Sequence, residues 1–253
     1  MQIKDNVFVI TGGGRGLGRA MAVHLAEQGA KLALVDLDGA ALDETVGLCA
    51  EKGAEARSYI CNITDEAKVE QAFAQIKQDF GQINGLVNNA GLLRDGMLIK
   101  VKDGELVGKM SLDQWQSVVD VNQTGTFLCT REAAGIMAVQ GQGGVIVNIS
   151  SVAKAGNIGQ TNYAATKAAV ASMVVTWGRE LARHGIRVGG IAPGVISTDM
   201  TAQMKPEAIE RLVAAVPVGR LGEMSEMAHT LQYIIENDFF NGRIVEMDGG
   251  LRM

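Results

Sequence analysis

Thr11–Gly18 reads TGGGRGLG, and this glycine-rich stretch decides the fold. It follows the apolar run Val7–Ile10, which predicts a buried strand, and it leads into a helical pattern that begins at Leu17. Glycine permits the tight turn between the two elements, because it has no Cβ. The free amides and the positive dipole at the start of a helix bind anions such as a pyrophosphate. The stretch therefore predicts a strand–turn–helix unit that receives the phosphates of a dinucleotide.

The rest of the chain repeats this alternation of strand and helix. The predicted strands are short and rich in β-branched residues, namely Val7–Ile10, Lys31–Val35, Ala56–Ile60, Leu86–Val87, Val145–Ile149, Ile186–Ile191 and Arg243–Met247. Helical patterns lie between them, one beginning at Leu17, one passing through Leu42 and Leu48, and three spanning Asp65–Phe80, Ser111–Val139 and Thr161–His184. A helix in each connection makes neighbouring strands parallel. The sequence predicts an α/β fold, a single Rossmann-type doubly wound domain over residues 1–253 with about seven parallel strands flanked by helices.

Composition favours one globular domain and argues against several classes of partner. The 253 residues are 47% hydrophobic and include only 3 prolines, and no linker or repeat is visible. A formal net charge of -5 and a pI of about 5.3 provide no basic surface for nucleic acid or an anionic membrane. No run approaches the roughly 18 apolar residues of a membrane span, and the first strand leaves no room for a signal peptide. We therefore expect a cytoplasmic protein.

Cysteine and histidine spacing provides no set of metal ligands. The cysteines are odd in number and lack a C-x-x-C pair, while the histidines stand far apart in the chain: Cys49, Cys61, Cys129, His24, His184 and His229. We therefore expect neither a metal site nor a disulfide framework.

The choice of dinucleotide depends on two side chains of opposite charge. Asp36 follows the second predicted strand, where a carboxylate accepts hydrogen bonds from both hydroxyls of an adenosine ribose and repels a 2′-phosphate. Arg15 argues in the other direction, because a guanidinium pairs well with a phosphate. NAD(H) is favoured, since the carboxylate repels directly whereas the arginine is free to turn into solvent. NADP(H) is the alternative.

Tyr163 and Lys167 are four positions apart near the start of a predicted helix, so both side chains lie on one face. An ammonium near the phenol favours the phenolate and brings tyrosine closer to a working general acid or base. The spacing alone is common in surface helices. Its meaning depends on the residues that accompany it.

Several further motifs accompany this pair, and the whole set resembles one enzyme family. Ser151 follows the fifth predicted strand, Asn122 lies in the long helix before it, and positions 88–91 and 193–194 read Asn-Asn-Ala-Gly and Pro-Gly. Together with Thr-Gly-x-x-x-Gly-x-Gly at the first turn, these motifs resemble the short-chain dehydrogenase/reductase family over essentially the whole chain. The resemblance implies an enzyme that transfers a hydride between nicotinamide C4 and the carbonyl or secondary alcohol of a small molecule.

The resemblance implies roles for four catalytic side chains. Tyr163 would donate or accept the proton, and Lys167 would lower the pKa of Tyr163 and hold the nicotinamide ribose. Ser151 would orient the substrate oxygen, and Asn122 would support a proton relay. Ser150 is the alternative to Ser151, which we prefer because the family places its catalytic serine just past the strand.

The resemblance also implies a set of cofactor contacts at the turns that follow the strands. Asn62 departs from the pattern, because many members carry an aspartate there that faces adenine N6, although an amide oxygen accepts the same hydrogen bond. The implied contacts are Gly12, Gly14, Arg15, Gly16, Leu17, Asp36, Asn62, Ile63, Asn89, Ala90, Gly91, Tyr163, Lys167, Pro193, Gly194, Ile196 and Thr198.

Within the family, the chain is most similar to the 3-oxoacyl-(acyl-carrier-protein) reductases of fatty acid biosynthesis, through segments 156–160 and 218–222. This similarity implies an acyl thioester substrate. Residues 138–144 contain no lysine or arginine, although related reductases carry basic residues there, so a carrier-protein partner stays open. The alternatives are an NAD-dependent alcohol or hydroxysteroid dehydrogenase and a non-catalytic NAD(P)-binding sensor. The family also implies a homotetramer, with Trp115 and Trp177 either at a subunit contact or in the core.

Two segments near the expected site carry further predictions. Residues 97–110 look like an insertion in which Asp103-Gly104 predicts a hairpin that overhangs the mouth of the site. Residues from about 195 to 222 are expected to form a lid, whose apolar side chains face an apolar substrate or pack on the sheet. The basic residues of the insertion either meet an anionic tail, such as a phosphopantetheine or coenzyme A group, or are simply solvated: Arg94, Lys100, Lys102 and Lys109.

Overall fold

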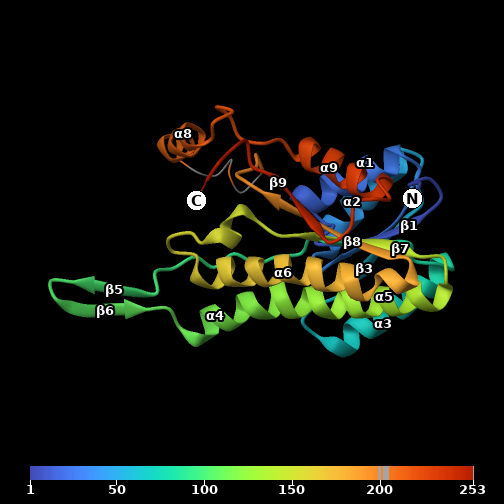
Figure 1. Ribbon diagram of the computed structural model, residues 1–253, viewed down its shortest axis with the longest axis horizontal. Helices are drawn as coiled ribbons and strands as arrows, with labels where there is room; N and C mark the ends of the chain where they lie inside the picture. Colours follow the sequence, from blue (N-terminus) through green and yellow to red (C-terminus); the bar gives the residue numbers. More distant parts are fainter. Residues whose placement is uncertain (199–200, 202–204, 253) are drawn as a thin grey trace.

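Seven parallel strands form one sheet at the centre of the protein (Figure 1). The computed structural model describes residues 1–198, 201 and 205–252. The order across the sheet is β3-β2-β1-β4-β7-β8-β9, so the chain leaves β1 in one direction and later returns to the other side of it. The strands are β1 (Val7–Thr11), β2 (Lys31–Asp36), β3 (Ala56–Ile60), β4 (Gly85–Asn88), β7 (Gly144–Ile149), β8 (Ile186–Pro193) and β9 (Arg243–Met247). The predicted Rossmann-type α/β fold is confirmed.

Helices cover both faces of this sheet (Figure 1). One face carries α1 (Gly16–Glu27), α2 (Gly39–Glu51) and α9 (Met224–Glu236). The opposite face carries α3 (Glu66–Phe80), α4 (Leu112–Val119), α5 (Thr126–Gln140) and α6 (Thr161–Glu180). A shorter helix, α8 (Pro206–Ala215), lies apart from both layers, in the segment expected to form the lid.

Alternate residues of the central strands contribute to two separate hydrophobic cores. In β1, Phe8 and Ile10 pack with α1 and α9, whereas Val9 packs on the opposite side of the sheet with α3 and α5. Leu32 and Leu34 of β2 repeat the pattern on the first side. Because both faces are buried, these strands read as continuous apolar runs rather than as an alternation of apolar and polar residues.

Aspartates fix the start of two helices. Asp38 caps α2 by accepting a hydrogen bond from the Ala41 amide, and Asp65 caps α3 by accepting one from the Lys68 amide. Each aspartate lies in the turn that follows a strand, so the strand-to-helix connections are short and well defined.

The long helix predicted over Ser111–Val139 is present, and its middle turn departs from α-helical geometry. Between α4 and α5 the chain forms a π-helical turn, Asp120–Gly125. Asn122 lies in this turn, where its side chain is buried and bonded to the backbone of Leu92. A single π turn inside a helix often marks a functional position, because the extra residue redirects a side chain.

Strands β5 (Ile99–Lys102) and β6 (Glu105–Lys109) form an antiparallel hairpin that projects from the body of the protein (Figure 1). Asp103 and Gly104 form its turn with φ angles of 53° and 82°, the left-handed values that suit a two-residue hairpin loop. The hairpin extends away from the helices and the sheet (Figure 1), and its expected overhang of the site mouth stays a prediction. Its position matters because its base adjoins the start of α6.

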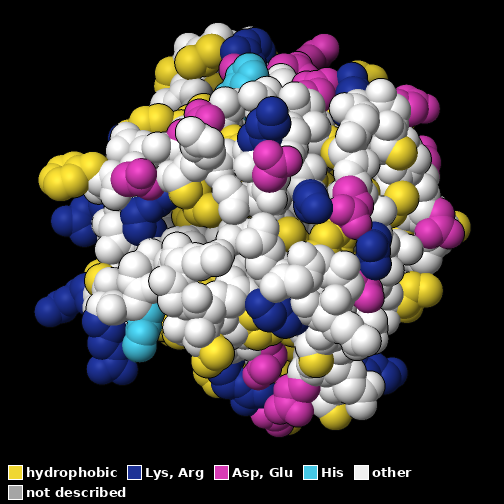
Figure 2. Space-filling model, turned by 90° about the vertical axis from the view of Figure 1, so that its right-hand side faces the viewer, with side chains coloured by type: hydrophobic (Ala, Val, Ile, Leu, Met, Phe, Trp, Pro, Cys, Tyr) yellow, Lys and Arg dark blue, Asp and Glu magenta, His cyan; other side chains and the backbone are white. Residues whose placement is uncertain are grey.

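The lid expected from residues 195–222 is described only in part. In α8, Ile209, Leu212 and Val213 share one face and are half-buried, whereas Met200 and Met204 lie outside the described residues. No helix among the described residues is long and apolar enough to cross a membrane. Acidic and basic side chains are interspersed on the face shown in Figure 2.

Candidate active site

The glycine-rich turn joins β1 to α1 at the edge of the sheet where all seven strands end. Gly12 and Gly16 have φ angles of +65° and +54°, a conformation that side chains disfavour. A Cβ on Gly12 would lie 2.9 Å from Ala90 Cα, and one on Gly18 would lie 2.0 Å from the Gly12 carbonyl oxygen. No side chain caps the start of α1. The turn therefore leaves an open helix end for an anion, in agreement with a pyrophosphate site.

Thr11 ties this turn to the Asn-Asn-Ala-Gly segment that follows β4. Its hydroxyl accepts hydrogen bonds from the amides of Asn89 and Ala90, each at 3.1 Å. The Asn89 amide group donates in return to the carbonyls of Thr11 and Gly12, at 3.2 and 3.1 Å. Strands β1 and β4 are neighbours in the sheet on either side of the point where the chain changes direction. Ligands of doubly wound folds bind at this point.

Asp36 lies at the end of β2, beside the glycine turn. One carboxylate oxygen accepts a hydrogen bond from the Gly14 amide at 3.1 Å, and the other accepts one from the Leu37 amide at 2.7 Å. Arg15 pairs with Asp38, and not with Asp36. The carboxylate of Asp36 is thus fixed by the backbone at the expected adenosine ribose, while the charge of Arg15 is compensated by its own chain.

Asn62 and Ile63 follow β3 on the adenine side of the expected crevice. The Asn62 amide oxygen accepts hydrogen bonds from the Thr64 amide at 3.1 Å and from the Thr64 hydroxyl at 3.0 Å. Ile63 is buried, and a Cβ on Gly125 would come within 2.6 Å of it. Asn62 is therefore engaged in a local turn, and this turn fixes its position relative to Ile63.

Tyr163 and Lys167 lie on the first turns of α6, one helical turn apart. The Lys167 nitrogen lies 5.5 Å from the centre of the Tyr163 ring and donates a hydrogen bond to the Ile149 carbonyl at 2.7 Å. Lys167 is 4% exposed, so its ammonium is almost completely removed from water. A Cβ on Gly91 would lie 3.7 Å from the same nitrogen. Lys167 thus connects α6 to the ends of β7 and β4.

Burial dominates the acid–base properties of this pair. It raises the pKa of Tyr163, an effect to which Asp95 adds and which a hydrogen bond with Ser151 opposes. It lowers the pKa of Lys167 to about 8. The largest influence on both groups is desolvation, which favours the neutral form of each, and the expected lowering of the Tyr163 pKa by Lys167 stays a prediction.

The two serines after β7 point to different partners. Ser150 donates a hydrogen bond from its hydroxyl to the Lys167 carbonyl at 2.8 Å and is buried. Ser151 accepts one from the Ala153 amide at 3.1 Å and lies within hydrogen-bonding reach of Tyr163. Only Ser151 is therefore positioned beside the Tyr163 hydroxyl, whereas Ser150 holds the backbone of α6.

Asn122 reaches the same region from the π-helical turn. Its side-chain oxygen accepts a hydrogen bond from the Leu92 amide at 2.6 Å, and its nitrogen donates to the Leu92 carbonyl at 3.0 Å. The nitrogen also donates to the Thr166 hydroxyl at 3.2 Å. Thr166 lies on α6 next to Lys167. The structure thus brings Asn122, Ser151, Tyr163 and Lys167 together at the carboxyl ends of β4 and β7.

The segment after β8 closes another side of the site. The Gly194 amide donates to the Met247 carbonyl at 2.9 Å, and the Thr198 amide donates to the Thr201 hydroxyl at 2.8 Å. Ile196 is buried and forms an isolated bridge with Gly222. The turn that begins at Pro193 is therefore attached to β9 on one side and to the start of α9 on the other.

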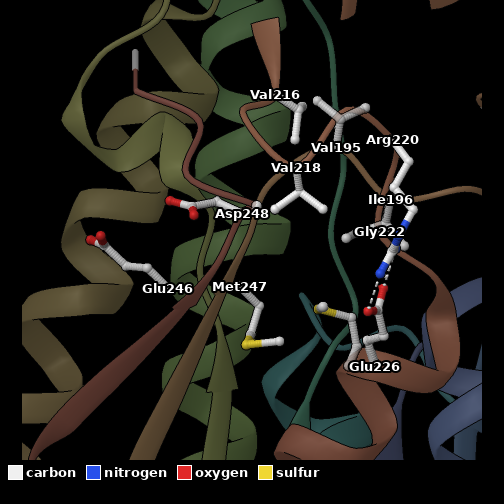
Figure 3. Close-up of a pocket in the computed structure, with 12 residues that line it drawn as sticks. Val195, Ile196, Val216, Val218, Arg220, Gly222, Glu226, Glu246, Met247 and Asp248 are labelled. Carbon is white, nitrogen blue, oxygen red and sulfur yellow. Dashed lines mark hydrogen bonds and ion pairs between the residues drawn. The ribbon is translucent and has the colours of Figure 1, made fainter. Parts of the chain in front are cut away.

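A small pocket of about 180 Å³ adjoins this segment (Figure 3). Val195, Ile196 and Val216 line one part of it, and Arg220 forms an ion pair with Glu226 at its edge. Pockets that bind cofactors or drug-sized ligands are usually larger than about 300 Å³. The pocket contains neither Tyr163 nor the glycine turn, so it lies apart from the residues expected to be catalytic.

Comparison with known proteins assigns the chain to a family. A family model described as short chain dehydrogenase matches residues 6–209. The chain belongs to this family. It is 35% identical over 254 residues to the 3-oxoacyl-(acyl-carrier-protein) reductase FabG of Thermotoga maritima, covering 99% of both chains. It is also 36% identical to the (3R)-3-hydroxyacyl-CoA dehydrogenase of Canis lupus familiaris, covering 100% of this chain and 98% of the relative.

A solved structure supports the same assignment. The 7α-hydroxysteroid dehydrogenase in complex with NADH and 7-oxo glycochenodeoxycholic acid has a TM-score of 0.90 and 28% identity, covering 99% of this chain and 96% of the other. As a member of the short-chain dehydrogenases, the chain is an oxidoreductase that acts on a CH–OH group with a nicotinamide dinucleotide. Among residues 1–198, 201 and 205–252, no cluster of three or more His, Cys, Asp or Glu side chains could hold a metal ion.

Sequence reasoning missed three supporting residues of this short-chain dehydrogenase. Thr11 joins the glycine turn to the β4 loop, Thr166 supports Asn122, and Asp38 holds Arg15. Thr11 belongs to the glycine motif itself, and the position of Asp38 before a helical pattern indicates a cap. No local signal identifies Thr166, because its role depends on the approach of the π-helical turn to α6.

Proposed function

We propose that this chain, acting over residues 1–253 as one dinucleotide-binding and catalytic domain, reduces the carbonyl of a 3-oxoacyl thioester to the secondary alcohol. The observation that carries the proposal is the convergence of Asn122, Ser151, Tyr163 and Lys167 beside the glycine turn. Three separate parts of the chain supply these residues, namely the π-helical turn, the segment after β7 and α6. A protein that only senses a dinucleotide does not need them together.

The residues along the sheet edge fit a nicotinamide dinucleotide. The start of α1 is uncapped and would receive its pyrophosphate. A Cβ at Gly12 would strike Ala90, so the turn requires glycine there. The contacts would come from Gly12, Gly14, Gly16 and Leu17. The ribose and nicotinamide would lie along residues 89–91 and 193–198, where Lys167 would hold the second ribose. When bound, the dinucleotide supplies or accepts the hydride at C4.

Tyr163 supplies the proton that accompanies the hydride. Because burial raises its pKa, Tyr163 keeps its proton at neutral pH and is ready to donate it to the carbonyl oxygen of the substrate. Ser151 positions that oxygen, since its hydroxyl already lies beside the phenol. Lys167 lies against the phenol ring, and Asn122 bonds to Thr166 on the same helix, so both help to hold Tyr163 in position. In the oxidative direction, Tyr163 accepts the proton of the alcohol.

NADH is the proposed cofactor, and NADPH the alternative. Asp36 presents a carboxylate held by two backbone amides at the ribose position, which repels a 2′-phosphate. Arg15 would attract that phosphate, but Asp38 already compensates its charge. The balance of charge at this end of the crevice is therefore against NADPH.

The relatives support the thioester substrate. One of them is a 3-oxoacyl-(acyl-carrier-protein) reductase and another a 3-hydroxyacyl-CoA dehydrogenase, and both align over nearly the whole chain. The two names describe opposite directions of the same chemical conversion, a 3-oxo group and a 3-hydroxy group. The absence of basic residues from segment 138–144 favours a coenzyme A thioester over a carrier-protein thioester.

A hydroxysteroid or alcohol dehydrogenase that uses NAD is the second candidate. It is favoured by Asp36 and by the likeness to a 7α-hydroxysteroid dehydrogenase that binds NADH. Both candidates share the site and differ in the substrate.

The test is the initial rate of NADH oxidation, and separately of NADPH oxidation, with acetoacetyl-coenzyme A. Turnover with NADH in preference to NADPH is the expected result. If neither dinucleotide supports turnover, a panel of secondary alcohols and steroids with NAD distinguishes the second candidate from a protein without catalytic activity.

We also propose that the enzyme works as a homotetramer in the cytoplasm. Phe127 and Val139 on α5 and Val175 on α6 are large apolar side chains that stay exposed on the outer helical layer. Exposed apolar side chains gathered on one layer mark a protein contact. Trp115 and Trp177 are half-buried on the same layer, between the core and this surface.

A further inference from the structure

We propose that the face of the β5–β6 hairpin that carries Lys100 and Lys102 binds the phosphate at the end of the pantetheine arm of the substrate. The inference rests on the proposed thioester substrate and adds a second contact site to it, on the hairpin whose base adjoins the start of α6. The ligand chemistry is a phosphate ester on an extended, uncharged arm. Coenzyme A and a carrier protein both present this group.

The base of the hairpin is fixed at the lip of the active site. The Gly96 amide donates to the Gly159 carbonyl at 2.7 Å, and the Gln160 side chain donates to the Asp95 carboxylate at 3.0 Å. Asn162, the neighbour of Tyr163, donates to the Arg94 carbonyl at 3.0 Å. The direction in which the hairpin leaves the body is therefore coupled to the start of the catalytic helix α6.

One face of the hairpin is graded from apolar to cationic. Lys100 and Lys102 are two positions apart in β5 and share a face, and Leu98 lies in the bend just before this strand, nearer the base. Residues directly opposite in the ladder share that face, and these are Gly108 and Glu105. The side chain nearest the site is apolar and the two beyond it are basic. An acyl thioester has the same order, with its apolar acyl chain at the site and its phosphate at the far end.

The other face of the hairpin has a different composition. Val101 is opposite Leu106, and Ile99 is opposite Lys109. Lys109 is therefore separated from Lys100 and Lys102 by the thickness of the ribbon. Arg94 is also removed from the set, because it bonds to the Ser117 hydroxyl at 3.2 Å and lies 3.6 Å from the Asp113 carboxylate. Of the four basic residues around the insertion, two remain on the graded face.

The charges of Lys100 and Lys102 are not compensated by the chain. Within residues 1–198, 201 and 205–252, no carboxylate lies within ion-pair distance of either ammonium, although Glu105 is on the same face. Lys31, Lys52 and Lys154 each lie against a carboxylate elsewhere on the surface.

The two lysines lie beyond the base of the hairpin. From Ile99 to Lys102 the strand spans three residue steps of about 3.3 Å each, roughly 10 Å. Lysine side chains add several ångströms of flexible reach. The pantetheine arm offers no charge until its phosphate, so a cation at this distance contacts the substrate only where the arm ends.

The experiment compares two thioesters that differ only beyond the pantetheine arm. Acetoacetyl-coenzyme A carries the phosphates, and acetoacetyl-pantetheine ends without one. For the double variant Lys100→Gln/Lys102→Gln, we expect KM for acetoacetyl-coenzyme A to rise by about threefold to tenfold, because two exposed charge contacts are lost. KM for acetoacetyl-pantetheine should stay within about twofold, and kcat should be unchanged for both.

Two matched variants on the same hairpin control for its overall charge. Lys109→Gln removes one positive charge from the opposite face and should leave both KM values unchanged. Glu105→Gln removes a negative charge from the graded face and should lower KM for acetoacetyl-coenzyme A alone. A rise in KM that is equal for Lys109→Gln and for the double variant would show a general charge effect and would overturn the site.

Acetoacetyl-acyl-carrier-protein identifies the source of the phosphate. If the double variant raises KM for both the coenzyme A and the carrier thioesters, or for one of them, the phosphate contact stands and the affected substrate is its source. Unchanged KM for both overturns the inference while leaving the proposed function intact. Absence of turnover with every 3-oxoacyl thioester, in the parent protein, instead contradicts the proposed function.

Discussion

Lys167 is a buried amine whose environment disfavours its charge. Burial lowers its pKa to about 8, from the usual 10.5 of a lysine amine in water. Between these two values the unfolded chain holds the proton and the folded chain has released it. The contribution of Lys167 to the free energy of unfolding therefore rises with pH between these two values, because the unfolded state binds more protons there. Below about pH 8 both states are protonated and the contribution is constant.

Because this contribution rises with pH, it leads to a prediction for Lys167→Met, a substitution of similar volume without charge. The difference in free energy of unfolding, parent minus variant, should increase as pH rises from about 8 towards 10.5. Urea denaturation at pH 7, 8, 9 and 10 measures it. A difference that stays flat or falls over that range would show that the amine is not desolvated as the structure indicates.

Asp38 is the ion-pair partner of Arg15, so its charge should decide whether Arg15 is available to a 2′-phosphate. Asp38→Asn keeps the oxygen that caps α2 and removes the charge that pairs with Arg15. We expect the Kd for NADPH to fall by about threefold to tenfold and the Kd for NADH to change little, measured by titration of the dinucleotide's fluorescence.

The control for this prediction is the double variant Arg15→Ala/Asp38→Asn. It should lose the gain in NADPH affinity, because the released guanidinium is absent. If Asp38→Asn alone leaves the Kd for NADPH unaltered, Asp36 by itself decides the preference and the pairing of Arg15 with Asp38 is without effect.

Single residues also show where sequence reasoning reaches its limit. The order of motifs identified Tyr163 and Lys167, because an i, i+4 pair on a helix is a local property. The preference for Ser151 over Ser150 rested on resemblance, since adjacent residues at the end of a strand differ only in direction. Their directions are fixed by contacts with Tyr163 and the Lys167 carbonyl, which lie far along the chain.

Among the elements of the site, the turn between β1 and α1 leaves the least space for an added side-chain atom. Gly18→Ala should abolish dinucleotide binding and destabilise the protein by about 1–3 kcal/mol, because its Cβ would lie 2.0 Å from the Gly12 oxygen and no side chain can yield. Gly47→Ala on α2 is the matched control, since nothing lies within 4 Å of its Cβ. It should stabilise the protein by about 0.5–1 kcal/mol.

Urea denaturation and NADH titration of both variants check this prediction. Retained NADH binding in Gly18→Ala would mean that the turn relaxes without loss, and that its geometry is not required for the phosphate site. A loss of stability in Gly47→Ala would mean that the contrast between the two glycines does not come from steric overlap.

The elements differ in how well the sequence predicts them. Strand β1 and the β5–β6 turn follow from local chemistry, a buried apolar run in one case and Asp103-Gly104 in the other. The π-helical turn at Asn122 does not. It depends on hydrogen bonds between Asn122 and Leu92, 30 positions away, which no helical periodicity contains.

At the scale of the whole molecule, the parallel sheet collects the ends of its strands at one edge. This property allowed the sequence to predict that the turns after β1, β2, β4, β7 and β8 share a site. It could not predict where the insertion would go, because a hairpin without contacts to the body takes its direction from its base. That base is held by Gly159, Gln160 and Asn162.

The proposed homotetramer is also a property of the whole molecule. Light scattering coupled to size exclusion should give four times the chain mass of 26.7 kDa. Val139→Glu introduces a charge on the outer layer, where the parent side chain is 91% exposed, and should reduce the assembled mass. A monomer in the parent protein would contradict the proposal.

In the proposed mechanism Tyr163 carries the proton in hydride transfer, and Tyr163→Phe removes the hydroxyl that does so. The measurement is the rate of NADH oxidation with acetoacetyl-coenzyme A, together with the Kd for NADH. We predict a loss of about 100-fold or more in rate with a Kd within about threefold of the parent, because only the phenolic hydroxyl is removed. A variant that keeps the parent's rate would show that Tyr163 does not carry the proton.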